Sequence, residues 1–409
     1  AVAGFSTANA QPLEEAIKNV DVSGSVVYRY NNYDNNGVNN GAQSESDNYK
    51  IGLNLSSKVN DYVKFNSRFI VGSQDNGGFA SLNSKKTNSG ATTSNADGQA
   101  DVSLSNAYFG FTAIPNTVVN IGKQGLTTPY TVATDINGNE QTGTGILALS
   151  TMGPVTAGAG YFNNTNLNAS TEINAGKGRG VGKVINANTA GNTFDGGLDM
   201  YVATVQGDLD FVKLEAWYAG LQNTFGSYTL AATSNLDLAE NAKLGLEARY
   251  VNLELNSAVA TGDAAKNSMF RFAADGKFSI VNARLAYTMT DKKGGLTALD
   301  QDAKNTSLGW NITSNGVANA DYYQAALGAD ILDNLNFTLN YGNLKSKATS
   351  NVILTGLNDF KAQEVYGQLT YKMSKNLNTY LRYGNFEQKI GGTKDIDQDM
   401  GRLQVAYTF

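Results

Sequence analysis

The chain ends in GRLQVAYTF, residues 401–409, and this stretch decides the fold. Leu403, Val405 and Tyr407 alternate with polar or small residues that begin at Arg402. A two-residue period places the two sets on opposite faces of a β-strand. The stretch therefore predicts a strand with one apolar face, ending in an aromatic residue, and one polar face.

The same alternation recurs along most of the chain. Near the start, Val22, Val26 and Tyr28 alternate with polar positions that end at Arg29. Other clear cases are 242–250, 335–341 and 377–383. The apolar face is aliphatic with aromatic residues near the strand ends, and the other face is polar and often basic. From residue 21 to 409 we therefore predict one all-β domain.

Connections of two lengths alternate between the predicted strands. Eight short turns fall near 57–61, 114–116, 153–154, 207–210, 239–241, 276–279, 332–334 and 374–376. Nine longer polar stretches cover 31–49, 74–98, 125–145, 163–195, 219–227, 254–267, 291–320, 345–362 and 386–398. These seventeen connections predict an 18-stranded antiparallel transmembrane β-barrel with short periplasmic turns and long extracellular loops.

Composition agrees with a membrane barrel. The 409 residues include 44 glycines and only 4 prolines, and no predicted strand interior contains proline. The mean hydropathy is −0.30, and no apolar run reaches the length of a transmembrane helix. A barrel buries only alternate residues in lipid, so its average hydropathy resembles that of a soluble protein. A soluble β-helix, the main structural alternative, would show a fixed repeat, and none appears.

Missing residue types restrict the chemistry. The chain has no histidine and no cysteine, which excludes Ser-His-Asp and Cys-His sites, thiolate metal sites and disulfides. An enzyme would need a carboxylate or lysine pair, and no such group stands out. The formal net charge is −5 without basic runs, which argues against nucleic-acid binding. We predict that the chain is not an enzyme.

A barrel of this size leaves an aqueous channel unless a plug fills it. Only residues 11–20 precede the first strand as a possible plug, so the sequence predicts an open pore. Basic residues on the predicted lumen face are Arg29, Lys50, Lys64, Arg68, Lys123, Arg249, Arg284, Arg382 and Arg402. Facing lipid, each would cost about 2–4 kcal/mol. They either form a basic strip across a constriction or only keep the lumen wet.

The third long connection, 125–145, contains two acids, Asp135 and Glu140, and no lysine or arginine. Folded into the pore as a constriction loop, it would set these carboxylates against the basic wall and create a transverse field. Otherwise it is an ordinary extracellular loop. The loop acids and the net charge of −5 predict weak cation selectivity.

The same loop offers oxygen ligands for a metal ion. Asp135, Asn137 and Glu140 could bind Ca²⁺, with Asp300 completing the site from the connection 291–320. The spacing does not match an EF-hand, because Gly138 stands at the fourth position rather than the sixth. No cofactor is expected to be required, and Ca²⁺ near the constriction is a candidate.

The N-terminus carries a targeting pattern. Residues 1–10 resemble the end of a signal peptide, closing on the small-residue triplet Ala8-Asn9-Ala10, although a disordered tail would have the same composition. Residues 11–20 begin with Gln-Pro, followed by Glu14 and Glu15, which suits a short helix or periplasmic segment.

These residues also carry a family resemblance. The segment PLEEAIKNVDVSGSVVYRY, residues 12–30, resembles the mature start of the Campylobacter-type major outer membrane porins, as do 122–124 and 143–145 around the third loop. The resemblance implies a homotrimeric 18-stranded porin of a Gram-negative outer membrane, with an inward-folded third loop, modest cation preference and antigenic surface loops. It also implies a possible divalent cation near the constriction. The terminal Phe409 is similar to the signal that such barrels present to their assembly machinery.

Two functions from different classes follow. The first is a water-filled channel for passive diffusion of ions and small hydrophilic solutes. The alternative is a surface adhesin or antigen whose barrel only anchors long loops, with host-surface ligands as partners and pore activity secondary. In both, membrane lipids and lipopolysaccharide surround the barrel.

Overall fold

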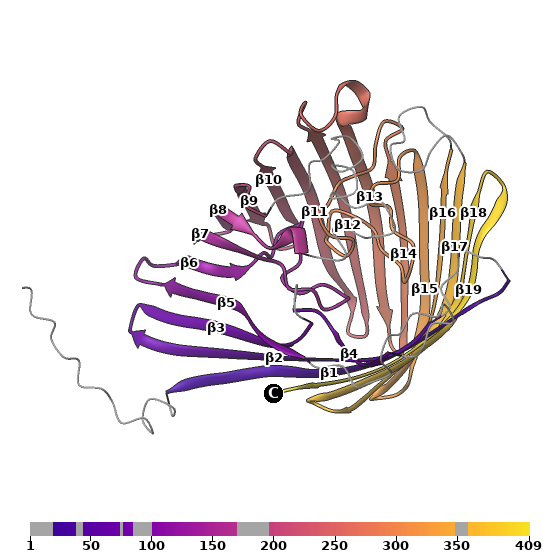
Figure 1. Cartoon of the computed structure of the whole chain (residues 1–409), viewed down its shortest axis with the longest axis horizontal. Coiled ribbons are helices and arrows are strands. Elements are labelled where there is room, and N and C mark those ends of the chain that lie inside the picture. Colours follow the sequence, from indigo (N-terminus) through magenta and orange to yellow (C-terminus); the bar gives the residue numbers. More distant parts are fainter. Residues whose placement is uncertain (1–18, 38–43, 74–76, 85–99, 170–195, 348–358) are drawn as a thin grey trace, which may run out of the picture.

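One antiparallel sheet of nineteen strands makes up nearly all of the computed structural model, which describes residues 19–37, 44–73, 77–84, 100–169, 196–347 and 359–409 (Figure 1). The predicted signal-peptide end, 1–10, and most of the N-terminal segment, 11–20, lie outside the described residues. No helix in the described part of the chain is long and apolar enough to span a membrane.

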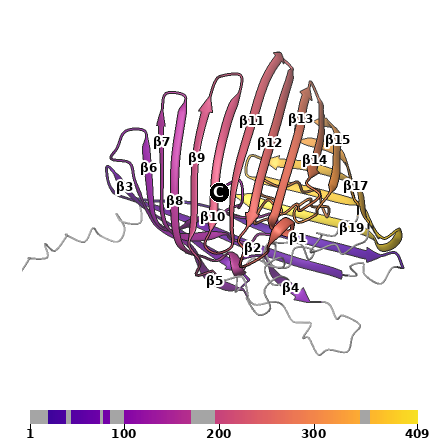
Figure 2. The same ribbon diagram turned by 90° about the horizontal axis from the view of Figure 1, so that it is seen from above.

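Apart from the short strand β4, the strands follow one another around the wall in chain order (Figure 2). Their bounds are β1 Val20–Asn35, β2 Ser44–Asn60, β3 Val63–Gly72, β4 Ala80–Ser84, β5 Asp101–Phe111, β6 Thr117–Gly125, β7 Thr142–Met152, β8 Val155–Thr165, β9 Met200–Asp208, β10 Lys213–Leu221, β11 Phe225–Ala239, β12 Ala242–Leu255, β13 Lys266–Phe278, β14 Val281–Thr290, β15 Ala320–Leu332, β16 Leu335–Ser346, β17 Phe360–Ser374, β18 Leu377–Ile390 and β19 Thr393–Thr408. In the described connections, η1 (Leu167–Ala169) and η3 (Gly262–Ala265) are short 3₁₀ helices.

Pairing of the first and last strands closes the barrel. β1 and β19 run antiparallel, with Val26 opposite Tyr407 and Tyr30 opposite Leu403. The short strand β4 is not part of the ring: it pairs with β2 beyond the end of β3, while β3 pairs with β5. Eighteen strands therefore form the wall, which confirms the predicted antiparallel barrel.

All eight predicted short turns join consecutive strands at one end of the barrel. Positive φ angles at Asn116, Gly153, Asp210 and Ser279 mark four of them. Glycine and asparagine tolerate this left-handed backbone better than most residues, which is why turns select them. The turn positions read from the sequence are confirmed.

Two of the nine predicted long loops are wrong. The stretch 219–227 is two strand ends joined by three residues, since Leu221 pairs with Phe225. The stretch 386–398 is strand as well, because β18 and β19 continue to a turn at Gly391 and Gly392, whose φ values of 58° and 81° suit a two-residue hairpin. Polar composition there indicated a loop, but ion pairs from Lys394 to Glu387 and Asp397, both 2.8 Å, stabilise a polar hairpin instead.

The two faces of the wall differ as predicted from the alternation. Large apolar side chains such as Leu285, Leu327 and Tyr383 are more than half exposed on the outside, the face that a membrane would cover. Arginines and amides on the same strands point inward. Near the periplasmic end the inward residues keep partial exposure, whereas near the extracellular end many are buried by loops inside the barrel.

Candidate functional site

The third loop, residues 126–141 between β6 and β7, folds into the lumen and is fixed to the wall by Glu140. The carboxylate accepts hydrogen bonds from Lys50 Nζ on β2 at 2.9 Å and from Arg68 Nε on β3 at 2.5 Å. Ser105 Oγ on β5 adds a third at 2.8 Å. Glu140 is only 3% exposed, so these charge-assisted bonds form away from bulk water, where they are strongest.

Two basic side chains compensate the negative charge of Glu140. Burial raises the pKa of the Glu140 carboxyl, but the ammonium of Lys50 and the guanidinium of Arg68 outweigh it and hold the pKa below its usual range. The carboxylate is therefore ionised at neutral pH and paired. Two positive charges of the wall are neutralised in part by one loop acid, so little of the predicted transverse field comes from this group.

Gly122 directs Lys123 towards the same loop. The side chain of Ile121 is exposed on the outer face, and a regular two-residue period would place Lys123 there too. Gly122 has φ of 130°, a conformation open to glycine, and a Cβ at this position would lie 2.5 Å from the Ala107 carbonyl oxygen. The interrupted alternation brings Lys123 Nζ to 3.0 Å from Thr142 Oγ1, at the end of the third loop.

The other end of the third loop reaches across the lumen to the opposite wall. Tyr130 is fully buried, and its hydroxyl lies 2.8 Å from Thr229 Oγ1 on β11. The loop therefore spans the lumen from β2 and β3, where Glu140 is bound, to β11.

A second connection also folds inward, and sequence reasoning missed it. The sequence predicts an extracellular loop for residues 291–319 between β14 and β15, which we call the seventh loop, yet most of its side chains are buried. Its backbone hydrogen-bonds to the third loop, from Leu299 N to Tyr130 O and from Asn305 N to Pro129 O, both 2.9 Å. Asp302 Oδ2 accepts a further bond from Ile136 N at 2.9 Å.

The signal for this loop was its apolar content. Leu296, Leu299, Trp310, Ile312 and Val317 are unusual in a connection exposed to water, and all five are buried. They pack in two clusters against the inner faces of β8–β13 and β15–β19.

The inner wall facing this loop is itself apolar. On β12, Val251, Leu253 and Leu255 point inward on the same face as Arg249, and none is more than 3% exposed. Near the extracellular end these strands therefore have apolar residues on both faces, one for lipid and one for the loops.

Two charged groups also bind the seventh loop to this wall. Arg249 Nη1 donates to Asn305 at 3.1 Å, and Arg271 Nη1 donates to the Thr306 carbonyl oxygen at 2.6 Å.

Arg249 thus holds a loop, although the sequence placed it among pore-lining residues. Arg271 is absent from the sequence prediction, although it shows the same pattern. The apolar residues Phe270 and Phe272 flank it, which places its side chain on the lumen face. Both arginines share Glu247, at 3.6 Å and 2.7 Å.

Three other predicted arginines lie together on the lumen face of β1, β18 and β19. Arg29, Arg382 and Arg402 donate through Nε to the neutral side chains of Gln404 (2.9 Å), Gln368 (2.8 Å) and Asn31 (2.7 Å). No acidic residue in the described part of the chain forms an ion pair with any of the three. Among the arginines predicted to face the lumen, these three have no ion-pair partner in the described residues, and we call them the uncompensated arginines.

The remaining candidates are dispersed. Arg284 pairs with Asp275 at 2.6 Å, where both are partly exposed in the periplasmic half of the lumen. Lys64 is exposed near the turn between β2 and β3. The geometry therefore separates the predicted basic residues into those that bind a loop, Arg284 paired with Asp275, Lys64 exposed near a turn, and the group of three.

The predicted Ca²⁺ ligands do not converge on one site. Glu140 faces Lys50 and Arg68, while Asp135 accepts bonds from the amides of its own loop, including Asn139 N at 2.8 Å. Asn137 donates its backbone N–H to Asp135 at 2.9 Å. Asp300 instead accepts a hydrogen bond from Gln141 Nε2, which also approaches Asp135 at 3.5 Å.

Among the described residues, no group of three or more acidic side chains is placed to hold a metal ion. Burial first, and then the neighbouring Asp302 and Asp135 carboxyls, raise the pKa of Asp300 to about 11. A carboxyl group that keeps its proton at neutral pH is a poor metal ligand. The four-residue set predicted from the sequence does not fit a Ca²⁺ site.

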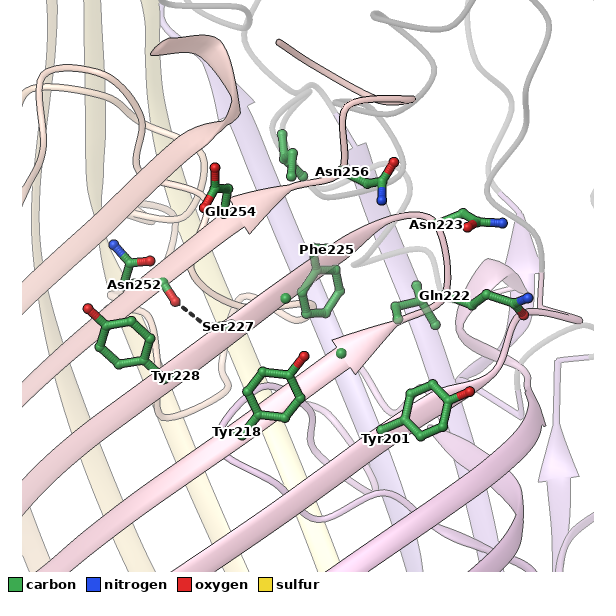
Figure 3. Close-up of a pocket in the computed structure, with 14 residues that line it drawn as sticks. Tyr201, Tyr218, Gln222, Asn223, Phe225, Ser227, Tyr228, Asn252, Glu254 and Asn256 are labelled. Atoms are coloured by element: carbon green, nitrogen blue, oxygen red, sulfur yellow. Dashed lines mark hydrogen bonds between the residues drawn. The ribbon is translucent and has the colours of Figure 1, made fainter. Parts of the chain in front are cut away.

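A depression of about 600 Å³ lies on the outer face near the extracellular ends of β9–β12, away from the lumen (Figure 3). Tyr201, Tyr218 and Tyr228 line it with rings about half exposed. Amphipathic rings in this position are typical of the aromatic girdle of a membrane barrel.

A closed eighteen-stranded barrel with an apolar exterior, an aromatic girdle and loops folded into a charged lumen defines an outer-membrane protein of the porin class. The family profile described as Campylobacter major outer membrane protein matches residues 1–409, the whole chain. The chain belongs to this family, as its N-terminal segment indicated. No curated protein sequence matches it.

Solved structures show the same fold at low sequence identity. OccAB3 of Acinetobacter baumannii is 14% identical with a TM-score of 0.73, and the match covers 96% of this chain and 99% of that one. OpdL of Pseudomonas aeruginosa is 14% identical with a TM-score of 0.71 and the same coverage. OprD of Pseudomonas aeruginosa is 17% identical with a TM-score of 0.68, covering 96% of this chain and 95% of that one.

Proposed function

We propose that the chain forms a water-filled pore for passive diffusion of ions and small hydrophilic solutes. The observation that carries this proposal is the third loop, which spans a barrel of eighteen strands and leaves Arg29, Arg382 and Arg402 uncompensated on the wall. A wall of this many strands encloses more space than its own side chains fill, so the inward loops set the width of the passage.

Planar-bilayer recording tests the proposal. We expect stepwise, ohmic conductance from the purified protein, tolerant of the applied voltage. If folded, reconstituted protein produces no conductance steps, the proposal is rejected.

Ion preference is a finer proposal. Weak cation selectivity follows from the net charge of −5 and from the two loop acids. The pairing of Glu140 weakens the second reason, and the three arginines oppose it. A reversal potential under a KCl gradient decides the sign: a value favouring chloride rejects cation selectivity and assigns control to the arginines.

We propose that the predicted set does not bind Ca²⁺, because Asp300 keeps its proton at neutral pH and Glu140 is paired with Lys50 and Arg68. We expect the thermal unfolding midpoint to be the same in millimolar Ca²⁺ and in EDTA. A midpoint that Ca²⁺ raises and EDTA lowers again would reject this proposal.

The surroundings of the barrel belong to the same proposal. We propose a homotrimer embedded in lipid and lipopolysaccharide and inserted by the outer-membrane assembly machinery, which would read Phe409. Cross-linking of the reconstituted protein tests the trimer, and Phe409→Ala tests assembly.

The alternative function as an adhesin is tested by shortening the β18–β19 hairpin: loss of host-surface binding with unchanged conductance would support it.

A further inference from the structure

The innermost part of the seventh loop is a small hairpin inside the barrel. Leu308 and Thr313 form an isolated antiparallel bridge, and Gly309 N donates to Ile312 O at 2.8 Å. Trp310 and Asn311 stand at the turn. We call residues 308–313 the loop tip. Its position decides how far the seventh loop reaches towards the arginines of β18 and β19.

One buried carboxylate holds both amides of this turn. Glu364 on β17 is 2% exposed, and its two oxygens accept hydrogen bonds from Trp310 N at 2.7 Å and Asn311 N at 2.8 Å. A carboxylate offers both of its oxygens as acceptors, and charge-assisted bonds of this kind are about twice as strong as neutral ones. A single side chain thus fixes the orientation as well as the position of the loop tip.

The residue before the turn fits this carboxylate closely. A Cβ on Gly309 would lie 1.9 Å from Glu364 Oε1 and 2.8 Å from the Tyr322 hydroxyl oxygen. Any side chain at position 309 would displace the carboxylate or the loop tip. Gly309 and Glu364 are therefore two independent points at which the same contact can be broken.

The contact sets the position of Trp310 over the arginines. The indole ring lies 5.0 Å from the Arg382 guanidinium carbon and 5.6 Å from that of Arg402, with Tyr366 edge-on at 5.3 Å. Cation–π contacts of this kind orient a guanidinium and cover one of its faces. While the tip is docked, solutes can approach these arginines only from the uncovered side.

We propose that Glu364 is a positioning residue of the pore: by binding the loop tip it keeps Trp310 over Arg382 and Arg402, and so limits both the pore width and the access of anions to these arginines. The inference rests on the proposed pore function. Glu364 itself acts through Trp310 and need not touch the solute.

Single-channel recording of Glu364→Gln tests the proposal. The amide has the shape of the carboxylate but accepts only one of the two bonds and sets an NH₂ group against the other N–H. We expect a second, larger conductance level from the undocked tip, visited about tenfold more often than in the wild type. Glu215→Gln is the control for charge, because Glu215 on β10 accepts a hydrogen bond from Trp217 of the same strand at 3.3 Å, and its replacement removes one acid while the contact between Glu364 and the loop tip stays intact.

A double-mutant cycle separates the contact from a charge effect. Gly309→Ala should give the same second level with Glu364 present, and the pair of substitutions should add little to either one, because both break one contact. Fully additive effects, or a Glu364→Gln variant that behaves like Glu215→Gln, would overturn the proposal. If one of the two substitutions prevents folding, the conductance of the other variant is compared with that of Glu215→Gln and decides the test.

Tryptophan fluorescence gives a readout that does not depend on conduction. The chain has two tryptophans, so Trp217→Phe leaves Trp310 as the only emitter. We expect Glu364→Gln to increase acrylamide quenching of Trp310 in this background, with no change for Glu215→Gln. If the wild type does not conduct, the pore function fails, yet this measurement still tests the contact; unchanged quenching overturns it.

Discussion

Two regions of the inner wall of the barrel hold the loops through different interactions. The wall of β2 and β3 holds the third loop through charge, with Lys50 and Arg68 on Glu140. The wall of β9–β13 holds the seventh loop mainly through apolar contacts, with Leu253 among the buried residues. The charged contact depends on complete pairing, while the apolar contact depends on close packing. The difference predicts that loss of charge at the first wall changes both stability and ion preference, whereas loss of packing at the second changes stability alone.

Removing the charge of Glu140 should have the largest effect. Glu140→Gln leaves Lys50 and Arg68 buried without their acid, and we expect a loss of about 3–5 kcal/mol in the free energy of unfolding. The reversal potential should shift towards anions. Urea unfolding and a KCl gradient measure the two effects. Glu215→Gln removes an equal charge from a partly exposed site, and a loss as large there would contradict the role of the buried pairing.

Truncating the apolar wall should cost somewhat less and leave ion preference unchanged. Leu253→Ala removes a side chain that is 1% exposed, with an expected loss of about 2–5 kcal/mol in the free energy of unfolding. Leu230→Ala on the outer face of β11 is the control, because Leu230 is 54% exposed and contacts no loop from that face. A shift in reversal potential for Leu253→Ala would show that the two walls are not separate in function.

Neutralising the three uncompensated arginines should change selectivity with little loss of stability. Replacing Arg29, Arg382 and Arg402 by Gln leaves no acid unpaired among the described residues. A unit charge at 4 Å in water is worth about 1 kcal/mol, so each substitution should raise the cation-to-anion permeability ratio by up to about fivefold. The reversal potential measures this ratio, and no shift for the triple variant would place the narrowest point elsewhere.

The junction between the two loops should respond to pH. Because the pKa of Asp300 is raised to about 11 in the folded protein from an ordinary value of 3.8, its contribution to stability is fully present below pH 3.8 and is lost as pH rises towards 11. The thermal unfolding midpoint should therefore fall between pH 5 and pH 9. Asp300→Asn should flatten this dependence, and an equally steep fall in that variant would assign the effect to other groups.

The wall was predictable because its signals are local. The two-residue period and the eight short turns depend on neighbouring residues alone, so the number of strands and their order followed directly. The wrong loops share one cause. At 386–398, polar composition predicts a loop, although cross-strand ion pairs can stabilise a polar strand beyond the membrane just as well.

The constriction was only half predictable. Glu140 and the basic wall could be proposed as partners because the third loop has acids and no bases. The seventh loop was missed because its destination depends on an apolar inner wall, and alternation cannot tell a strand with one apolar face from one that has two. Arg249 shows the consequence: its face was read correctly, but its partner, Asn305, lies 56 positions along the chain.

Sequence alone determined that this chain is an antiparallel membrane barrel of eighteen strands, since lipid on one face and water on the other impose a two-residue period that any strand must display. Tertiary structure decided which charges remain free in the lumen. Pairing such as that of Glu140 with Lys50 and Arg68 joins residues 72 to 90 positions apart, and burial by a loop is a property of the whole enclosed volume. The face of the strand on which a residue lies follows from its neighbours in sequence. Its interaction partner depends on the closed barrel.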